Sequence, residues 1–173
     1  MEERDLIHQF LNGKVSVESA DVLRLIIVFV GFSLLAYLFL IISRKIMVNT
    51  VGKLVKKSKT NIDDIFFERH TFYWVAQFVP ALVFYFSTDF IFVDFPNWIP
   101  SVHRLVNAYI AFSFFAVLIT ILNSFKEILA AMPYFKDKPV NSYIQLVKIF
   151  AYAFGIIWIT SILLQKSPLY FFS

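Results

Sequence analysis

The chain has 173 residues, of which 59% are hydrophobic and 19% aromatic, and its net charge is +4. A soluble domain of this length could not bury so much apolar surface, because much of it would remain outside the core. The absence of cysteine excludes disulfides, thiolate metal sites and cysteine nucleophiles. The basic residues lie between apolar stretches, so we assign them to lipid headgroups and topology and expect no nucleic acid partner.

Residues 1–21 are mixed in charge and largely polar, and we expect them to form a separate N-terminal segment. Within it, Leu6, Ile7, Phe10 and Leu11 share one face at helical spacing, which predicts a short amphipathic helix on the membrane surface. A frayed terminus is the alternative. The segment lacks the basic start, apolar run and cleavage site of a signal peptide.

Four long stretches contain no charged residue, and they are residues 25–42, 71–88, 105–125 and 149–165. With about 1.5 Å of rise per residue, each stretch as a helix comes close to the hydrocarbon thickness of a bilayer. We therefore predict an all-α integral membrane fold with short interfacial amphipathic helices. Residues 22–173 would form one domain with transmembrane helices at about 22–45, 65–92, 102–127 and 142–165.

After the first uncharged stretch, the sequence changes from apolar on all sides to amphipathic. Residues 46–59 are amphipathic, and their cationic face includes Lys53, Lys56, Lys57 and Lys59. This pattern predicts a helix on the inner leaflet whose lysines contact anionic lipid headgroups. A solvated basic linker is the alternative.

A new helix start is predicted at Thr60, Asp63 and Asp64. The hydroxyl can cap free N–H groups, and the carboxylates occupy the first turn, where the helix dipole favours negative charge. The two carboxylates could also form a paired acidic site. Adjacent helical side chains point about 100° apart, however, so they do not converge on one atom, and capping is the preferred interpretation.

Pro80 lies in the middle of the second apolar stretch. Proline removes one backbone hydrogen bond and clashes with the preceding turn, so we predict a helix kink at this position. Gln77, one turn earlier, is a candidate for a polar contact with a neighbouring helix.

The third stretch contains a narrow strip of small residues at spacing i, i+3, i+7 and i+11. The strip is formed by Ser113, Ala116, Thr120 and Ser124. Small residues let helices approach closely, and their hydroxyls can bond across the contact, so the strip predicts a helix–helix interface. A chance arrangement in an apolar segment is the alternative.

The lysines and arginines are divided unevenly between the two sides of the predicted array. Eleven of the 16 lie in the connections between the first and second and between the third and fourth stretches. The positive-inside rule then places these connections in the cytoplasm and both ends of the chain outside.

Motifs for catalysis or metal binding are missing from the sequence. His8, His70 and His103 share no helical face at ligand spacing, and the apolar stretches contain no ionisable residue other than tyrosine. There is also no Ser-His-acid set, glycine-rich phosphate loop or HExxH pattern. We therefore expect no enzyme activity, no metal and no cofactor.

Two stretches resemble a known family. Residues 56–69, KKSKTNIDDIFFER, resemble the segment joining membrane helices in the small-conductance mechanosensitive ion channel family, where a K-T-x-x-D-D run is common. Residues 138–173 are similar to the helix that precedes the pore helix in that family. The resemblance covers most of the chain in architecture and is closest to the bacterial miniconductance-type subgroup with five membrane helices.

The resemblance implies a multi-pass protein of the bacterial inner membrane with a periplasmic N-terminus, which acts under osmotic stress as a homo-oligomer. Family members continue with a Gly/Ala-rich pore helix and a cytoplasmic β-rich domain, and neither is recognisable here. We therefore expect the tension-sensing membrane region of a channel subunit, in contact with membrane lipids and without pore or gate residues. A non-conducting multi-span membrane scaffold or assembly subunit is the alternative.

Overall fold

A computed structural model describes residues 17–55, 71–135 and 139–172, and within these ranges every regular element is helical. Four segments are long and apolar enough to cross a membrane, which confirms the predicted all-α membrane fold. They are α2 (Val17–Val55), the broken pair α4 (Thr71–Ala76) and α5 (Phe78–Ile91), α6 (Ile99–Ala131) and α7 (Val140–Leu164). Short 3₁₀ helices follow α5, α6 and α7, namely η1 (Pro96–Trp98), η2 (Pro133–Phe135) and η3 (Pro168–Phe172).

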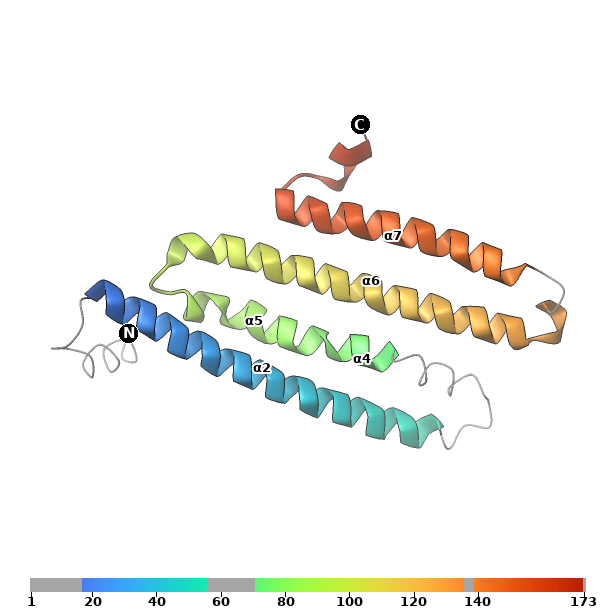
Figure 1. Cartoon of the computed structure of the whole chain (residues 1–173), viewed down its shortest axis with the longest axis horizontal. Coiled ribbons are helices and arrows are strands. Elements are labelled where there is room, and N and C mark those ends of the chain that lie inside the picture. Colours follow the sequence, from blue (N-terminus) through green and yellow to red (C-terminus); the bar gives the residue numbers. More distant parts are fainter. Residues whose placement is uncertain (1–16, 56–70, 136–138, 173) are drawn as a thin grey trace.

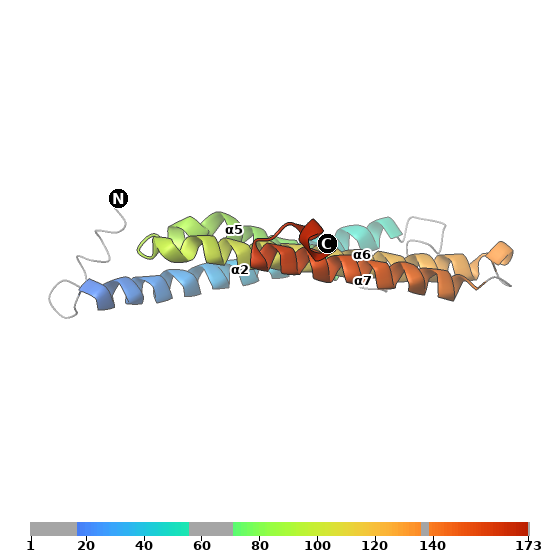
Figure 2. The same ribbon diagram turned by 90° about the horizontal axis from the view of Figure 1, so that it is seen from above.

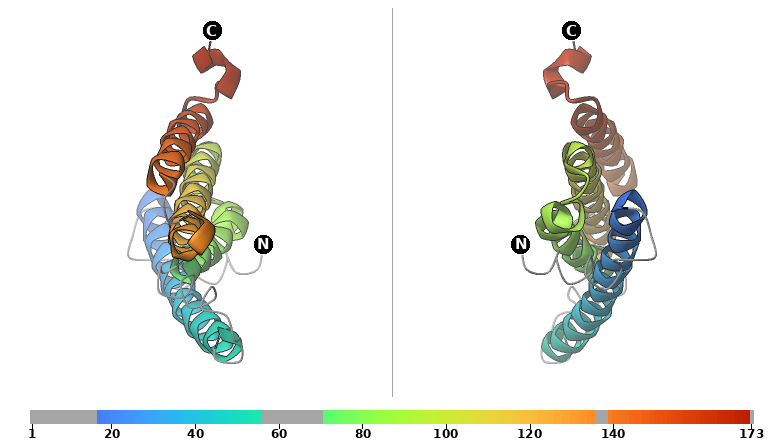
Figure 3. Two further views of the ribbon diagram at one scale, coloured as in Figure 1. Left: turned by 90° about the vertical axis from the view of Figure 1, so that its right-hand side faces the viewer. Right: turned by 90° about the vertical axis from the view of Figure 1, so that its left-hand side faces the viewer.

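The helices lie side by side in a single layer rather than in a closed bundle (Figure 1). Seen from above the layer is thin, and the end-on views show that it curves (Figures 2 and 3). Each helix packs mainly against its neighbours in this layer. The α2 helix contacts α4 and α5, the α4 and α5 helices contact α6, and α6 contacts α7. We call the end that holds η1 the turn end, and the end that holds η2 and the last turns of α2 the basic end.

Proline positions determine where several helices begin. Proline lacks an N–H, which the first turn of a helix does not need. Pro96, Pro133 and Pro168 start the three 3₁₀ helices, Pro100 is the second residue of α6, and Pro139 precedes α7.

The positions buried between helices are mostly small residues. They include Ala36, Ala76, Ala81, Ala108, Ala111, Ser113, Ser124, Ala151 and Gly155. Small side chains let helix backbones approach closely, which is how membrane helices gain packing energy without a hydrophobic driving force. Large apolar side chains are instead exposed on every helix. Only 6% of the most apolar window of α2 is buried, and the layer has no thick core.

The first helix differs from the prediction. Residues 46–55 continue α2 without a break. The prediction that a separate interfacial helix starts at residue 46 is therefore wrong. The change from apolar to amphipathic sequence does not end a helix, because the backbone hydrogen bonds are satisfied within it, and Gly52 weakens it by only about 1 kcal/mol. The helix also begins at Val17, five residues before the predicted boundary at residue 22.

Candidate functional site

The α-helical hydrogen-bond pattern of the second membrane segment is interrupted at Gln77, between α4 and α5, although the Gln77 backbone itself stays helical (φ −67°, ψ −17°). We call this interruption the helix break. The Gln77 amide donates to the Trp74 carbonyl oxygen at 3.1 Å, three residues back rather than four, so this turn is tighter than an α-helical turn. With the new helix starting at Phe78, Pro80 falls in its first turn. Because Pro80 has no N–H, the carbonyl of the fully buried Ala76 lacks its usual donor four residues ahead.

The break is attached to α6 by polar and aromatic contacts. The Tyr109 hydroxyl donates to the Gln77 side-chain oxygen at 2.9 Å. The rings of Trp74 and Phe112 pack edge to face with centroids 6.0 Å apart. These contacts fix the break and its α4 side against α6.

Three members of the predicted small-residue strip are buried in α6, and Ala116 is half-buried. Their hydroxyls do not make the cross-helix bonds we expected. Thr120 donates to the Ala116 carbonyl at 2.8 Å, and Ser124 donates to the Thr120 carbonyl at 3.2 Å, both within α6. The Ser113 hydroxyl has no hydrogen-bond partner among the described residues. Serine and threonine hydroxyls commonly bond carbonyls of their own helix in this way. The strip therefore provides small side chains for packing rather than hydrogen bonds between helices.

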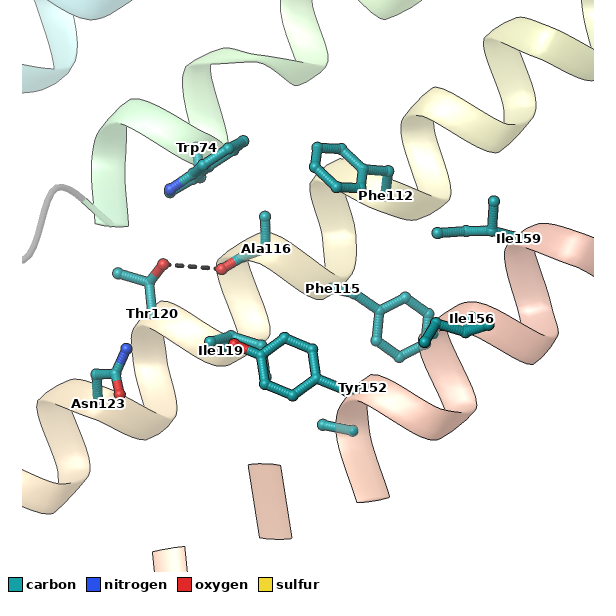
Figure 4. Close-up of a pocket in the computed structure, with 12 residues that line it drawn as sticks. Trp74, Phe112, Phe115, Ala116, Ile119, Thr120, Asn123, Tyr152, Ile156 and Ile159 are labelled. Carbon is teal, nitrogen blue, oxygen red and sulfur yellow. Dashed lines mark hydrogen bonds between the residues drawn. The ribbon is translucent and has the colours of Figure 1, made fainter. Parts of the chain in front are cut away.

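A groove of about 510 Å³ runs over α6 between α4 and α7, and we call it the α4–α7 groove. Figure 4 shows Trp74 on one side and Tyr152 and Ile156 on the other, with Ala116 and Ile119 of α6 between them. Its lining is mainly apolar, with Thr120 and Asn123 as its polar members from α6.

A second groove, of about 550 Å³, lies between α5 and α7 and is lined by Phe78, Phe114 and Trp158 among others. Phe115 lines both grooves, whereas Phe112 lines only the first and Phe114 only the second, and these two differ by roughly 160° around the helix. Both residues are exposed, at 48% and 56%. Among residues 17–55, 71–135 and 139–172, nothing therefore covers these two side chains, and the layer is hollowed at α6 on both faces.

Lys148 lies near the basic end of the α4–α7 groove, where it contacts Asn123 in the groove lining. Lys148 of α7 donates to the Asn123 side-chain oxygen at 2.9 Å. Lys148 is half-buried and lies just before the fourth uncharged stretch. This contact joins α6 to α7 close to the predicted membrane boundary.

A buried ion pair at the turn end was not foreseen from the sequence. The Arg24 guanidinium lies 2.7 Å from an Asp94 carboxylate oxygen, and the two side chains are only 5% and 2% exposed. Arg24 also donates to the Phe90 carbonyl at 3.4 Å and lies over the Phe90 ring. The sequence shows the two opposite charges at the same predicted end of two spans, but it does not show that these spans are neighbours in this register.

The remaining predicted residues fall largely outside the described ranges. Lys53 lies in the last turn of α2, whereas Lys56, Lys57, Lys59, Thr60, Asp63 and Asp64 lie in the segment that is not described. Within the described ranges, no group of three or more His, Cys, Asp or Glu side chains could hold a metal ion.

His103 comes within 3.5 Å of Asp89, whose side chain is 71% exposed, so this contact contributes little to stability.

In comparisons with known proteins, no family model, curated protein or solved structure matches the chain.

Proposed function

We propose that the chain is the membrane-tension-sensing region of a mechanosensitive ion channel subunit, which precedes the pore helix and cytoplasmic domain of that family. The observation that supports this proposal is the single-layer arrangement. In a closed bundle, inner helices are shielded from lipid. Here even α6, with a neighbour on each side, exposes Phe112 and Phe114 on opposite faces.

Such a layer couples directly to the state of the bilayer. Tension thins and spreads the membrane, and a helix responds to the mismatch by tilting or by losing lipid contacts. A conformation with a better match to the thinner bilayer then gains population. The break at Gln77 gives the second segment a place to bend during such a change.

Orientation and assembly belong to the same proposal. The positive-inside rule and the resemblance both favour a bacterial inner membrane protein with its N-terminus in the periplasm. The resemblance also favours a homo-oligomer, in which tilt of these helices would be passed to the pore helix.

The test is patch recording of the complete channel that contains this region. Changing Lys53, Lys56, Lys57 and Lys59 together to glutamine should shift the tension threshold, because the basic stretch then loses its attraction to anionic lipid. Lys166→Gln, at the opposite end of the layer, is the matched control and should leave the threshold unchanged. An unaltered threshold in the fourfold variant would count against the sensing role.

Residues 1–173 alone should not conduct, because the proposed pore lies outside them. Reconstituting the purified chain in liposomes and recording under tension checks this. Reproducible single-channel currents would overturn the assignment of a pore-free region.

A further inference from the structure

We propose that α2 is a splint across the helix break at Gln77. It would be held permanently by Arg24 at the turn end and held releasably by Arg44 at the basic end. The proposal concerns the conformation of this chain and stands whether or not the chain gates a channel.

The first step is that α2 contacts the second membrane segment through one arginine at each end of its uncharged stretch. Arg24 pairs with Asp94, and the Arg44 guanidinium lies 3.9 Å from the centre of the Tyr73 ring. Twenty residues separate the two arginines, which corresponds to roughly 30 Å along a helix and matches the hydrocarbon thickness. Each arginine can therefore sit at one membrane boundary.

The second step is that the two contacts fall on opposite sides of the break. Asp94 follows the end of α5, whereas Tyr73 belongs to α4. A change in the bend at Gln77 moves these two points relative to each other. It must therefore disturb at least one arginine contact as long as α2 stays straight.

The third step is that the Arg24 and Arg44 contacts differ in strength. The Arg24–Asp94 pair is almost fully buried and has charge on both partners. Arg44 is half-buried against a ring that is 39% exposed. Its Nε has no hydrogen-bond partner within the described residues, and no carboxylate there pairs with it. A cation over an exposed ring is held more weakly than a buried, hydrogen-bonded ion pair.

The fourth step is that packing between the two arginines is concentrated toward the turn end. The ring pairs Phe29–Phe84 and Phe32–Phe90, each with centroids 5.8 Å apart, join α2 to α5. A hollow of about 280 Å³ lies between Phe39 of α2 and a row of α5 residues that runs from Val79 to Phe86. Phe39 thus leaves space beside α5, whereas Phe29 and Phe32 pack directly against rings of α5.

On its other side, the break is fixed by the Tyr109–Gln77 hydrogen bond. The mobile element is then the basic end of α2, which pivots about the Arg24–Asp94 pair. When Arg44 leaves Tyr73, α4 loses its ring contact with the basic end of α2 but keeps its contacts with α6, so the bend at Gln77 is less constrained.

The test uses pairs of spin labels, which the absence of native cysteine makes simple. Val48 and Ala130 report the basic end, and Val22 and Trp98 report the turn end, because all four side chains are exposed. Distances are measured on the whole chain in lipid nanodiscs. Tyr73→Leu and, independently, Arg44→Gln should broaden and lengthen the Val48–Ala130 distances and leave the Val22–Trp98 distances unchanged.

Tyr73→Phe is the matched control, because it keeps the ring face and should keep the parent distances. The unchanged Val22–Trp98 distances, measured for the same substitution in a separately labelled sample, show that the fold persists. The splint is refuted if both Tyr73→Leu and Arg44→Gln keep the parent Val48–Ala130 distances. It is equally refuted if Tyr73→Phe has the same effect as Tyr73→Leu, since the hydroxyl rather than the ring would then hold Arg44.

Discussion

The contact between α6 and α7 differs in kind from the contact between α2 and the broken segment. At the first, a Cβ added to Gly155 would lie only 3.0 Å from the Phe115 ring, so the ring fills the space beside the glycine. At the second, the long side chains of Arg24, Phe29 and Arg44 reach across from α2. Gly31, on an exposed part of α2, has open space where a Cβ would stand. A close-packed contact between small residues tolerates little movement, whereas long side chains can release and rebind. We therefore regard α6–α7 as the fixed part of the layer and α2 as the adjustable part.

The largest effect is expected where the adjustable part is anchored. Arg24→Leu removes the guanidinium from a carboxylate that is 2% exposed, and should lower the free energy of unfolding by about 3–5 kcal/mol. Unfolding in mixed micelles, followed by circular dichroism, measures this. The exchanged pair Arg24→Asp with Asp94→Arg should recover most of the loss. If Arg24→Leu alone is neutral, the pair is no anchor.

A smaller loss is expected when a bulky side chain enters the buried strip of α6. Ser124 is fully buried, so Ser124→Leu should cost about 2 kcal/mol through overpacking. Ala116→Leu is the comparison, because that position is half-buried and faces the α4–α7 groove, which has space for the added atoms. Equal losses in the same unfolding assay would show that the groove does not accommodate extra volume.

The two glycines give a matched test of close against open packing. Gly155→Ala should destabilise the fold by about 1 kcal/mol, since the Phe115 ring must move, even though alanine favours the helix. Gly31→Ala should stabilise it by about 0.5–1 kcal/mol, because only the helix propensity changes. Thermal melting in detergent separates the two outcomes. Opposite signs are required; a stabilising Gly155→Ala would mean that α7 is not closely packed.

The smallest effect concerns the polar contact at the break. Tyr109→Phe removes one hydrogen bond to Gln77, and such bonds in membrane proteins contribute about 0.6 kcal/mol on average. A double-mutant cycle with Gln77→Leu gives the coupling energy directly. A coupling energy of zero would show that α6 does not fix the break.

The sequence was sufficient to predict the four membrane helices, because the uncharged stretches already have the length that a bilayer requires. It also indicated a distortion near Pro80, and the structure has its break three residues earlier, which places Pro80 in a first turn. The continuity of α2 is not evident from the sequence, because the change from apolar to amphipathic pattern does not show whether the helix ends there.

The neighbour relations could not be predicted from the sequence. Spans that are apolar on all sides have no polar face to show which side meets a partner. For the same reason, the single layer gave no sequence signal that would distinguish it from a bundle. The Arg24–Asp94 pair requires the antiparallel register of two helices, which only the tertiary structure supplies.

The most direct test of the single layer is the lipid accessibility of three consecutive residues of α6. Spin labels at positions 112, 113 and 114 of the chain alone, in a bilayer, are exposed to oxygen, which dissolves in the hydrocarbon. Both Phe112 and Phe114 positions should show frequent oxygen collisions, and the Ser113 position should be protected. Protection of either phenylalanine position to the level of Ser113 would mean that one face of α6 is covered, and would contradict the layer and the sensing role built on it.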